Sequence, residues 1–436
     1  LAHGVKPVVT VNGEKVDLDW SKPNAKLNLF DEGVYEIVVT YDNLVYDAVT
    51  ETITIVVDYN EPVITLIPEI DVVENGVYYT AKENYGLKIT LTEELYDYYY
   101  GLGFKPEVTV NGEAVELDWS KPEATLNLPD NGVYEIVVSY SNCWKFAEDK
   151  LITIVVDHEK PVITLTPDIE LVQNNVYYTA KENYGLKISL TDDLYDHNLA
   201  CGIEPVVTVN GKEEKLDWTK PETVLTLAEN GVYEITVNYA NYLHKAEEKT
   251  ITIVVDHEVP VIELIHGIED SDLLVDGTYY TDDENYKLTI HLTEDLYDYY
   301  LTCGIAPVVT VNGVETTLTW NHMDDEAVLE AILPLTEDGV YAIAVNYANY
   351  LHTAEEKTIT ICRDTVDPEV TITYRDAEGK DVVSEIVNHV GETVFADAVT
   401  AVITVKDVNF DQNSVALTVT PANAVAQTRT YTASWT

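Results

Sequence analysis

The sequence predicts an all-β protein built from consecutive two-layer sandwich domains. Three observations lead to this prediction: the composition, short strand-like runs between turn residues, and a string that occurs four times. The chain has 436 residues, with 31 tyrosines against 5 phenylalanines. Tyrosine, valine, isoleucine and threonine favour a β-sheet that has one face exposed to solvent. No stretch shows helical periodicity over a useful length, so we expect strands throughout.

The recurring string reads acidic residue, any residue, Gly, Val, Tyr. Its tyrosines, Tyr35, Tyr134, Tyr233 and Tyr341, are spaced by 99, 99 and 108 residues. Such a period suits an independent domain and is too long for a solenoid unit. Because the chain starts and stops inside a repeat, we expect it to be a fragment of a longer polypeptide. The expected domains are a partial one at 1–58, whole ones at 59–157 and 158–256, one with an insertion at 257–365, and a partial one at 366–436.

The first strands of the second repeat follow from local patterns. PVITL (62–66) and NGVYYT (75–80) are rich in β-branched and aromatic residues. GLKITLT (86–92) alternates apolar with polar residues, as a strand with one buried face does. PEVTVNGEAVELDW (106–119) contains Asn-Gly, which accepts the positive φ angles of a tight hairpin turn. We expect two strands joined at that turn.

The later strands of the same repeat carry the recurring string. EATLNL (123–128) leads into GVYEIVVSY, in which Tyr134 and Ile136 share one face and Glu135 lies on the other. LITIVVD (151–157) closes the repeat, and a proline follows four residues after its final aspartate. The junction VVDHEKPVI is short and proline limits its backbone freedom, so we expect the domains to be arranged as an elongated rod.

The acidic-x-Gly-x-Tyr entry resembles the tyrosine corner of immunoglobulin-like sandwiches, in which the tyrosine hydroxyl bonds to upstream backbone. Antibody domains place a cysteine two residues later, where this chain has isoleucine, so packing alone must join the two sheets. The strings DNGVYEIVV, ITIVVDHEKPVITL and AVITVKDVNFD (401–411) look like the bacterial immunoglobulin-like (Big) domains found in tandem on large surface proteins of Gram-positive bacteria. The resemblance implies tandem immunoglobulin-like β-sandwich domains in a cell-surface context, and it implies no particular ligand.

The charge of the chain excludes some classes of partner. Its 77 acidic and 25 basic residues give a net charge of −52. A field of that sign repels nucleic acid and anionic membranes. No apolar run approaches the roughly 18 residues of a membrane span. The first residues, LAHGVKPVVT, lack the layout of a signal peptide, so a signal for secretion would lie outside this chain.

Acidic clusters recur as TEELYDYYYG (92–101), TDDLYDHN (191–198) and TEDLYDYY (293–300). Together with the aspartates that close the repeats, they could supply the six to eight oxygen ligands of Ca²⁺. A solvated acidic face is the interpretation we favour, because no spacing matches a loop with a fixed ligand order. We predict no cofactor and no metal ligand, with Ca²⁺ as the alternative. The aspartates in question are Asp58, Asp157 and Asp256.

Aromatic residues also recur at fixed positions. The tyrosine runs at 96–100 and 297–300 could stack on sugars or anchor a protein, or they could fill the contact between neighbouring domains, which we favour. Tryptophans follow a hairpin strand in LDW or LTW, and we expect core packing for them. These residues are Trp20, Trp119, Trp218 and Trp320, with Trp435 as the match in the last repeat.

No catalytic pattern is present: the chain has no GxSxG, HExxH, glycine-rich phosphate loop or CxxC. Cys201 and Cys303 share a repeat position that holds His3 and Leu102 in other copies, which argues against a ligand or a nucleophile. Cys303 and Cys362 fall in one repeat, and the sequence leaves open whether they form a disulfide. We predict no enzymatic activity and no catalytic residue.

The sequence therefore predicts a structural or adhesive extracellular region, acting as a stalk or fibre segment of a bacterial cell-surface protein. The near identity of the second and third repeats favours this function, because extension needs no separate chemistry in each copy. One alternative is a glycan- or host-protein-binding module, and another is an accessory region of a large secreted glycan-degrading enzyme. The expected partners are a protein or glycan on a neighbouring cell or subunit, with self-association into a fibre left open.

Overall fold

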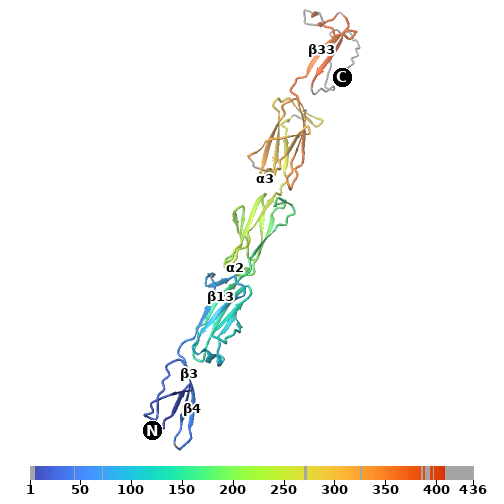
Figure 1. Ribbon diagram of the computed structural model, residues 1–436. Coiled ribbons are helices and arrows are strands. Elements are labelled where there is room, and N and C mark those ends of the chain that lie inside the picture. The colour runs from blue at the N-terminus through green and yellow to red at the C-terminus, as the bar shows by residue number, and fades with distance from the viewer. Residues whose placement is uncertain are drawn as a thin grey trace. The chain divides into compact units, whose positions relative to one another are not determined.

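The structure of the chain, a computed structural model, describes residues 5–43, 45–70, 72–269, 273–324, 327–383, 386–387, 393–395 and 397–407 (Figure 1). The chain divides into two compact units. The first consists of Leu1–Asp168, Gly185–Thr226 and Tyr233–Thr252, and the second of Ile169–Tyr184, Leu227–Val232 and Ile253–Thr436. The second sequence repeat lies wholly in the first unit, and the fourth lies wholly in the second.

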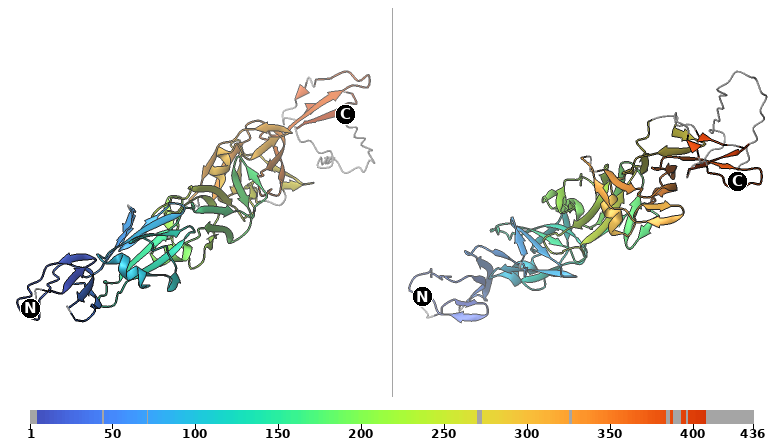
Figure 2. Two further views of the ribbon diagram at one scale, coloured as in Figure 1. Left: turned by 60° about the horizontal axis from the view of Figure 1, so that its bottom comes forward. Right: turned by 90° about the horizontal axis from the view of Figure 1, so that it is seen from above.

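The second repeat is a β-sandwich, whose strands can be followed in the two views of Figure 2. Its elements are β5 (Val63–Ile67), β6 (Val72–Glu74), β7 (Val77–Thr80), β8 (Tyr85–Thr92), α1 (Tyr96–Gly101), β9 (Glu107–Val110), β10 (Glu113–Val115), β11 (Glu123–Leu128), β12 (Gly132–Ser139) and β13 (Lys150–Val156). One sheet has the strand order β11-β8-β5, and the other has the order β10-β9-β12-β13-β7-β6. The contact of β13 with β7 is parallel, which lets the chain cross from one sheet to the other after β5.

The core of this sandwich is built from the apolar faces that the sequence patterns predict. Leu87 on β8, Ile136 on β12 and Ile154 on β13 are fully buried, whereas Glu135 is exposed. The side chains of this core all come from residues between Ile64 and Val156 and from both sheets. Burying one such aliphatic side chain contributes about 1.5–3 kcal/mol. The prediction of an all-β, immunoglobulin-like sandwich is confirmed.

The tyrosine corner is present. The Tyr134 hydroxyl donates to the carbonyl oxygen of Asp130 at 2.8 Å, and Tyr35 and Tyr341 make the same bond at 2.8 and 2.6 Å. A Cβ atom at Gly132 would lie 3.3 Å from the ring of Tyr134, which explains the glycine between the acidic residue and the tyrosine. The corner therefore fixes the point at which the chain enters β12.

The Asn-Gly hairpin is also present, with φ of 50° at Asn111 and 80° at Gly112. The side chain of Asn111 does more than permit the turn. It donates through Nδ2 to the carbonyl oxygen of Val133 at 3.1 Å and accepts the N–H of Glu135 at 2.8 Å. The turn is thereby tied to β12.

The first and third repeats carry the matching elements. In the first repeat these are β1 (Val8–Val11), β2 (Glu14–Val16), β3 (Gly33–Tyr41) and β4 (Val49–Val57), in the sheet order β2-β1-β3-β4. In the third they are β14 (Val162–Thr166), β15 (Val172–Gln173), β16 (Val176–Thr179), β17 (Tyr184–Thr191), α2 (Tyr195–Ala200), β18 (Val206–Val209), β19 (Lys212–Glu214), β20 (Glu222–Leu227), β21 (Gly231–Asn238) and β22 (Lys249–Val255).

The insertion in the fourth repeat adds a strand. The elements are β23 (Val261–Ile265), β24 (Leu274–Val275), β25 (Thr278–Thr281), β26 (Lys287–Thr293), α3 (Tyr297–Thr302), β27 (Val308–Val311), β28 (Val314–Thr316), β29 (Trp320–His322), β30 (Val328–Pro334), β31 (Gly339–Asn346) and β32 (Lys357–Arg363). β29 pairs with β30 and extends one sheet to the order β23-β26-β30-β29. The fifth repeat contributes β33 (Glu369–Arg375), β34 (Ile386–Val387), β35 (Thr393–Val394) and β36 (Thr400–Lys406).

Three short helices depart from the expectation of strands throughout. α1, α2 and α3 have six residues each and begin at the tyrosine of the acidic clusters. A helix of this length makes fewer than two turns, so its sequence shows no measurable 3.6-residue period. None of the helices that the structure describes has the length and apolar character of a membrane span.

The tryptophans and cysteines have clear positions. Trp119 and Trp218 are buried, as core packing predicts, whereas Trp20 and Trp320 are partly exposed. Trp435 lies outside the described residues. Cys362 is buried on β32 and Cys303 is exposed after α3, and the structure does not join them in the disulfide that the sequence left open.

Replacing Ile136 with alanine tests the core of the second repeat. Ile136→Ala removes three carbon atoms from a fully buried site, so we expect the free energy of unfolding of this repeat to fall by about 2–5 kcal/mol. Urea unfolding followed by hydrogen exchange of residues 132–139 measures it. Glu135→Ala, on the exposed face of β12, is the control and is expected to change it by less than about 0.5 kcal/mol. Equal effects of the two substitutions would contradict this packing.

Candidate functional site at the joints between repeats

The closing aspartate of each repeat lies where the next repeat begins, a boundary that we call a joint. Asp58, Asp157 and Asp256 end the string ITIVVD in the first three repeats. Only 4% of Asp157 and 1% of Asp256 is exposed. A carboxylate removed from water to this degree needs hydrogen-bond donors. At the first three joints, the next repeat supplies donors.

At the third joint, between the third and fourth repeats, Asp256 accepts two hydrogen bonds through Oδ2. The Tyr300 hydroxyl on α3 lies 2.7 Å away, and Asn349 Nδ2 lies 3.0 Å away. Asn349 Nδ2 also donates to Oε2 of Glu294 at 3.0 Å, and Glu294 is 4% exposed. One side-chain amide therefore bridges two buried carboxylates.

The loop that follows β31 holds Asn349 in place for this bridge. Oδ1 of Asn349 accepts the N–H groups of Leu351 at 2.8 Å and His352 at 2.7 Å, which is an Asx turn. Nε2 of His352 lies 2.8 Å from the carbonyl oxygen of Asp256, so the loop also contacts the backbone of the preceding repeat. The string ANYLH thus encodes a loop whose asparagine faces the joint.

The first joint repeats the arrangement. Asp58 Oδ2 accepts from the Tyr99 hydroxyl on α1 at 2.5 Å and from Asn142 Nδ2 at 3.2 Å. Asn142 Nδ2 also donates to Oε2 of Glu93 at 3.1 Å. Its Oδ1 accepts two backbone N–H groups of its own loop at 2.9 and 2.8 Å, as at the third joint.

The second joint also has two neighbouring carboxyl groups, but each of them has its own donors. Asp157 Oδ2 accepts from Asn241 Nδ2 at 3.0 Å. The neighbouring carboxylate is Asp192, which accepts from the Tyr239 hydroxyl at 2.6 Å and from Asn198 Nδ2 on α2 at 3.1 Å. Asn198 stands at the position of Tyr99 and Tyr300, so the helix still supplies a donor, although to the other carboxylate.

Burial dominates the electrostatics of the joints. It raises the pKa of Asp256, and burial followed by the negative charge of Asp256 raises the pKa of Glu294. Burial likewise raises the pKa of Asp157 and of Glu93. These directions are opposite to the lowering that an ion pair with lysine or arginine would cause.

The second residue of the corner string forms a further contact across the joint. Asn131 accepts the N–H of His158 at 2.9 Å, which holds the chain as it leaves the second repeat. Its Nδ2 donates to Oδ2 of Asp193 in the third repeat at 3.0 Å. Asn230 makes the same two bonds at the third joint, at 2.9 and 2.8 Å. The variable residue of the corner string is therefore a joint residue.

Tyrosine rings cover the other side of the second and third joints. At the second, Tyr79 lies 4.6 Å from Tyr242, measured between ring centroids. At the third, Tyr178 lies 4.8 Å from Tyr350, and its hydroxyl is 2.7 Å from that of Tyr299. Tyr79 and Tyr178 belong to the earlier repeat and are buried. The structure thus supports packing between repeats for the tyrosine runs.

The sugar-binding alternative for these runs keeps one exposed ring, Tyr100, which is 40% exposed. Tyr99 and Tyr300 are buried in the joints, and Tyr96 and Tyr297 are buried in the cores of their own repeats. The closing aspartates do come together with the acidic clusters, as the calcium interpretation supposed. However, no three His, Cys, Asp or Glu residues in the described part of the chain are grouped as a metal site requires.

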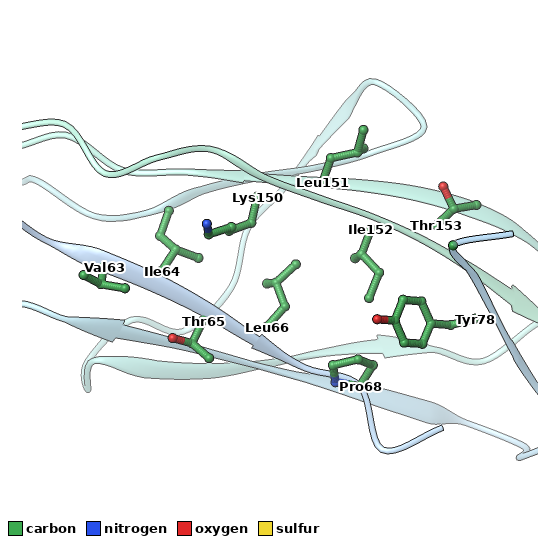
Figure 3. Close-up of a pocket in the computed structure, with 11 residues that line it drawn as sticks. Val63, Ile64, Thr65, Leu66, Pro68, Tyr78, Lys150, Leu151, Ile152 and Thr153 are labelled. Carbon is green, nitrogen blue, oxygen red and sulfur yellow. The ribbon is translucent and has the colours of Figure 1, made fainter. Parts of the chain in front are cut away.

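Two surface features remain outside the joints. Trp144 and Phe146, in the loop after β12, are each 77% exposed. An open hollow of about 700 Å³ lies between β5 and β13, where Ile64, Leu66 and Ile152 line it (Figure 3). Lys150, which also lines the hollow, pairs with a neighbouring glutamate, Glu148, at the protein surface. Thr65, Tyr78 and Thr153 also line the hollow, so its lining mixes polar with apolar side chains.

Comparison with known proteins adds resemblances in fold. No family model and no curated protein matches the sequence. Among solved structures, a tetra-tandem repeat in the extending region of a large adhesion protein is 12% identical and covers 83% of this chain and 92% of its own, with a TM-score of 0.42. Invasin, a bacterial integrin-binding protein, is 11% identical and covers 84% and 73%, with a TM-score of 0.29. The SGBP-B protein of the Bacteroides ovatus mixed-linkage glucan utilization locus is 13% identical and covers 74% and 75%, with a TM-score of 0.19. At these identities and TM-scores, the resemblances carry no argument about function.

Replacing Asn349 with alanine tests the bridge. Asn349→Ala leaves two buried carboxylates without their shared donor, so we expect the free energy of unfolding to fall by about 1–3 kcal/mol. Urea unfolding followed by hydrogen exchange of residues 339–356 measures the loss. The control is Asn346→Ala, which removes a bond to exposed Glu356 and is expected to cost less than about 0.5 kcal/mol. A loss at position 349 no larger than at position 346 would rule out the bridge.

Proposed function

We propose that the chain is a structural and adhesive extracellular repeat region, a stalk or fibre segment of a bacterial cell-surface protein. The observation that carries this proposal is the recurrence of one joint chemistry at three successive boundaries. A segment that extends a protein from a surface must limit bending at each boundary, and it needs no separate chemistry in each repeat. In this proposal the domains are residues 1–58, 59–157, 158–256, 257–365 and 366–436, and each forms its own sandwich.

The joints have the properties that limited bending requires. At the third joint, hydrogen bonds reach Asp256 from α3 and from the loop after β31, two different elements of the fourth repeat. Contacts from two separated elements resist rotation about more than one axis. Pro260 follows four residues after Asp256 and removes further backbone freedom. The partners of such a region are a protein or glycan on a neighbouring cell or subunit, including a second copy in a fibre.

A second candidate function is binding by the exposed aromatic loop of the second repeat. Trp144 and Phe146 present their rings to solvent, whereas their counterparts are Leu243 and Lys245 in the third repeat. Exposed aromatic rings stack on sugars and anchor protein partners. This candidate differs from the first because it assigns one repeat a chemistry that the others lack.

Small-angle X-ray scattering tests the stalk proposal. With strands of about 33 Å per domain, repeats joined end to end give a maximum dimension well over about 100 Å. We expect a radius of gyration well above the roughly 22 Å of a compact chain of this length. A measured radius close to that compact value would contradict the proposal.

The aromatic loop is tested by binding to an array of glycans and to extracellular matrix proteins. If it binds, Trp144→Ala is expected to weaken binding at least about tenfold, because one stacking residue carries a large share of such contacts. Leu243→Ala at the matching position of the third repeat is the control and should leave binding unchanged. Identical binding by the Trp144→Ala variant and the native chain would exclude this loop as the site.

A further inference from the structure

Each of the first three joints places two carboxyl groups close together, and no lysine or arginine is paired with them in the described part of the chain. At the third joint, Asp256 Oδ2 and Glu294 Oε2 each lie 3.0 Å from Nδ2 of Asn349, so the two oxygens lie within about twice that distance of each other. Both side chains are almost fully buried. Among the residues that the structure describes, no lysine or arginine pairs with either group. Two carboxylates in such a setting repel each other, and their burial costs free energy.

The groups that face this pair come from every element around it. Tyr300 on α3 donates its hydroxyl to Asp256, and Tyr347 at the end of β31 faces Glu294. His352 directs Nε2 to the carbonyl oxygen of Asp256 rather than to its carboxylate. Asp295, beside Glu294, adds a further negative charge. The surroundings thus supply neutral donors and one histidine, and they supply no fixed positive charge.

We propose that the carboxyl pair at each of the first three joints is a proton-operated latch, in which uptake of a proton by the pair tightens the contact between two successive repeats. A protonated carboxyl group carries one donor, whereas two carboxylates can only accept. The proton also removes the repulsion between the two groups. The latch does not depend on what the extended chain binds, and it makes the stiffness of the joints depend on pH.

The direction of the pH effect follows from burial. In the joined state, burial raises the pKa of Asp256 and of Glu294, whereas in an opened joint both groups return to ordinary values of about 4. The joined state therefore binds more protons than the opened state at intermediate pH. Lowering the pH favours the joined state, by up to about tenfold for each pH unit and each proton taken up. The tightening of the joint is complete once the pH falls below the ordinary pKa values of the two carboxyl groups.

The arrangement is not confined to one joint. Burial raises the pKa of Asp157 at the second joint, where Asp192 is the neighbouring carboxylate. It raises the pKa of Glu93 at the first joint, where Asp58 is the neighbour. Because the pKa shifts at the first three joints have the same direction, lowering the pH is expected to tighten all three of them.

Replacing one carboxylate of the pair with its amide tests the latch. In Asp256→Asn, the side-chain oxygen can keep the bonds from Tyr300 and Asn349 while the charge is lost. Hydrogen–deuterium exchange of the Leu351 and His352 amides in the full chain reports the ordering of the loop that contacts Asp256, because Asn349 holds both N–H groups and also donates to Asp256 across the joint. The residues around these amides are the same in variant and native chain, so their intrinsic exchange rates cancel in the ratio.

We expect the two amides to be about tenfold more protected from exchange in the variant than in the native chain near pH 8. The ratio of the protection in the variant to that in the native chain is expected to fall toward one near pH 5. Glu315→Gln, at an exposed position on β28, is the charge-matched control and should give a ratio of one throughout. A ratio below one near pH 8, or a ratio that does not change with pH, would overturn the latch. So would a rise in native protection near pH 8 on addition of Ca²⁺, which would assign the pair to a metal. Should Asp256→Asn lose its fold by circular dichroism, Asp157→Asn provides the same test at the second joint through Leu243 and His244.

Discussion

A carboxylate that is buried must be given hydrogen-bond donors, and this requirement governs the boundaries of the repeats. Asp256 lies at the end of its own closing strand, but the side chains that satisfy it belong to the next repeat. An opened joint would expose the carboxylate to water, and a joint that closed in another geometry would leave it unsatisfied. The hydrogen bonds therefore select one arrangement of neighbours more than they add raw stability, since a net contribution of about 1 kcal/mol per bond is typical.

The donors at the first three joints are mostly neutral, which matters in a chain with a net charge of −52. Tyrosine hydroxyls and asparagine amides satisfy the aspartates without neutralising them, so burial is left to raise the pKa of Asp157 and Asp256. The fourth joint differs. There Asp338, at the corner position, accepts from Nη1 of Arg363 at 2.7 Å, and Arg363 replaces a valine of the other closing strands. This corner carboxylate is thus paired with a cation, whereas the described donors to the closing aspartates of the first three joints are neutral hydroxyl and amide groups.

The fold could be predicted from the sequence because its signals are local. The alternation around Ile136, the Asn111-Gly112 turn and the corner at Tyr134 each depend on residues a few positions apart. The joints could be recognised only in part. The sequence identifies Asp256 as a residue at a junction between repeats. Its partner Asn349 lies 93 residues further along the chain, and an asparagine in a loop indicates only a turn. The short helices escaped prediction because six residues show no period.

Variation among the repeats is informative about what the joint requires. The position held by Tyr99 and Tyr300 is occupied by Asn198 in the third repeat, and a ligand site would not survive such a change of shape. A hydrogen-bond donor does survive it: the tyrosines donate to the closing aspartate, and Asn198 donates to Asp192, the other carboxylate of the pair. The loss of one hydroxyl is matched by the bond from Tyr239 to that same carboxylate. What the copies share is thus a satisfied pair of carboxyl groups, and residue identity is free to change as long as the pair keeps its donors.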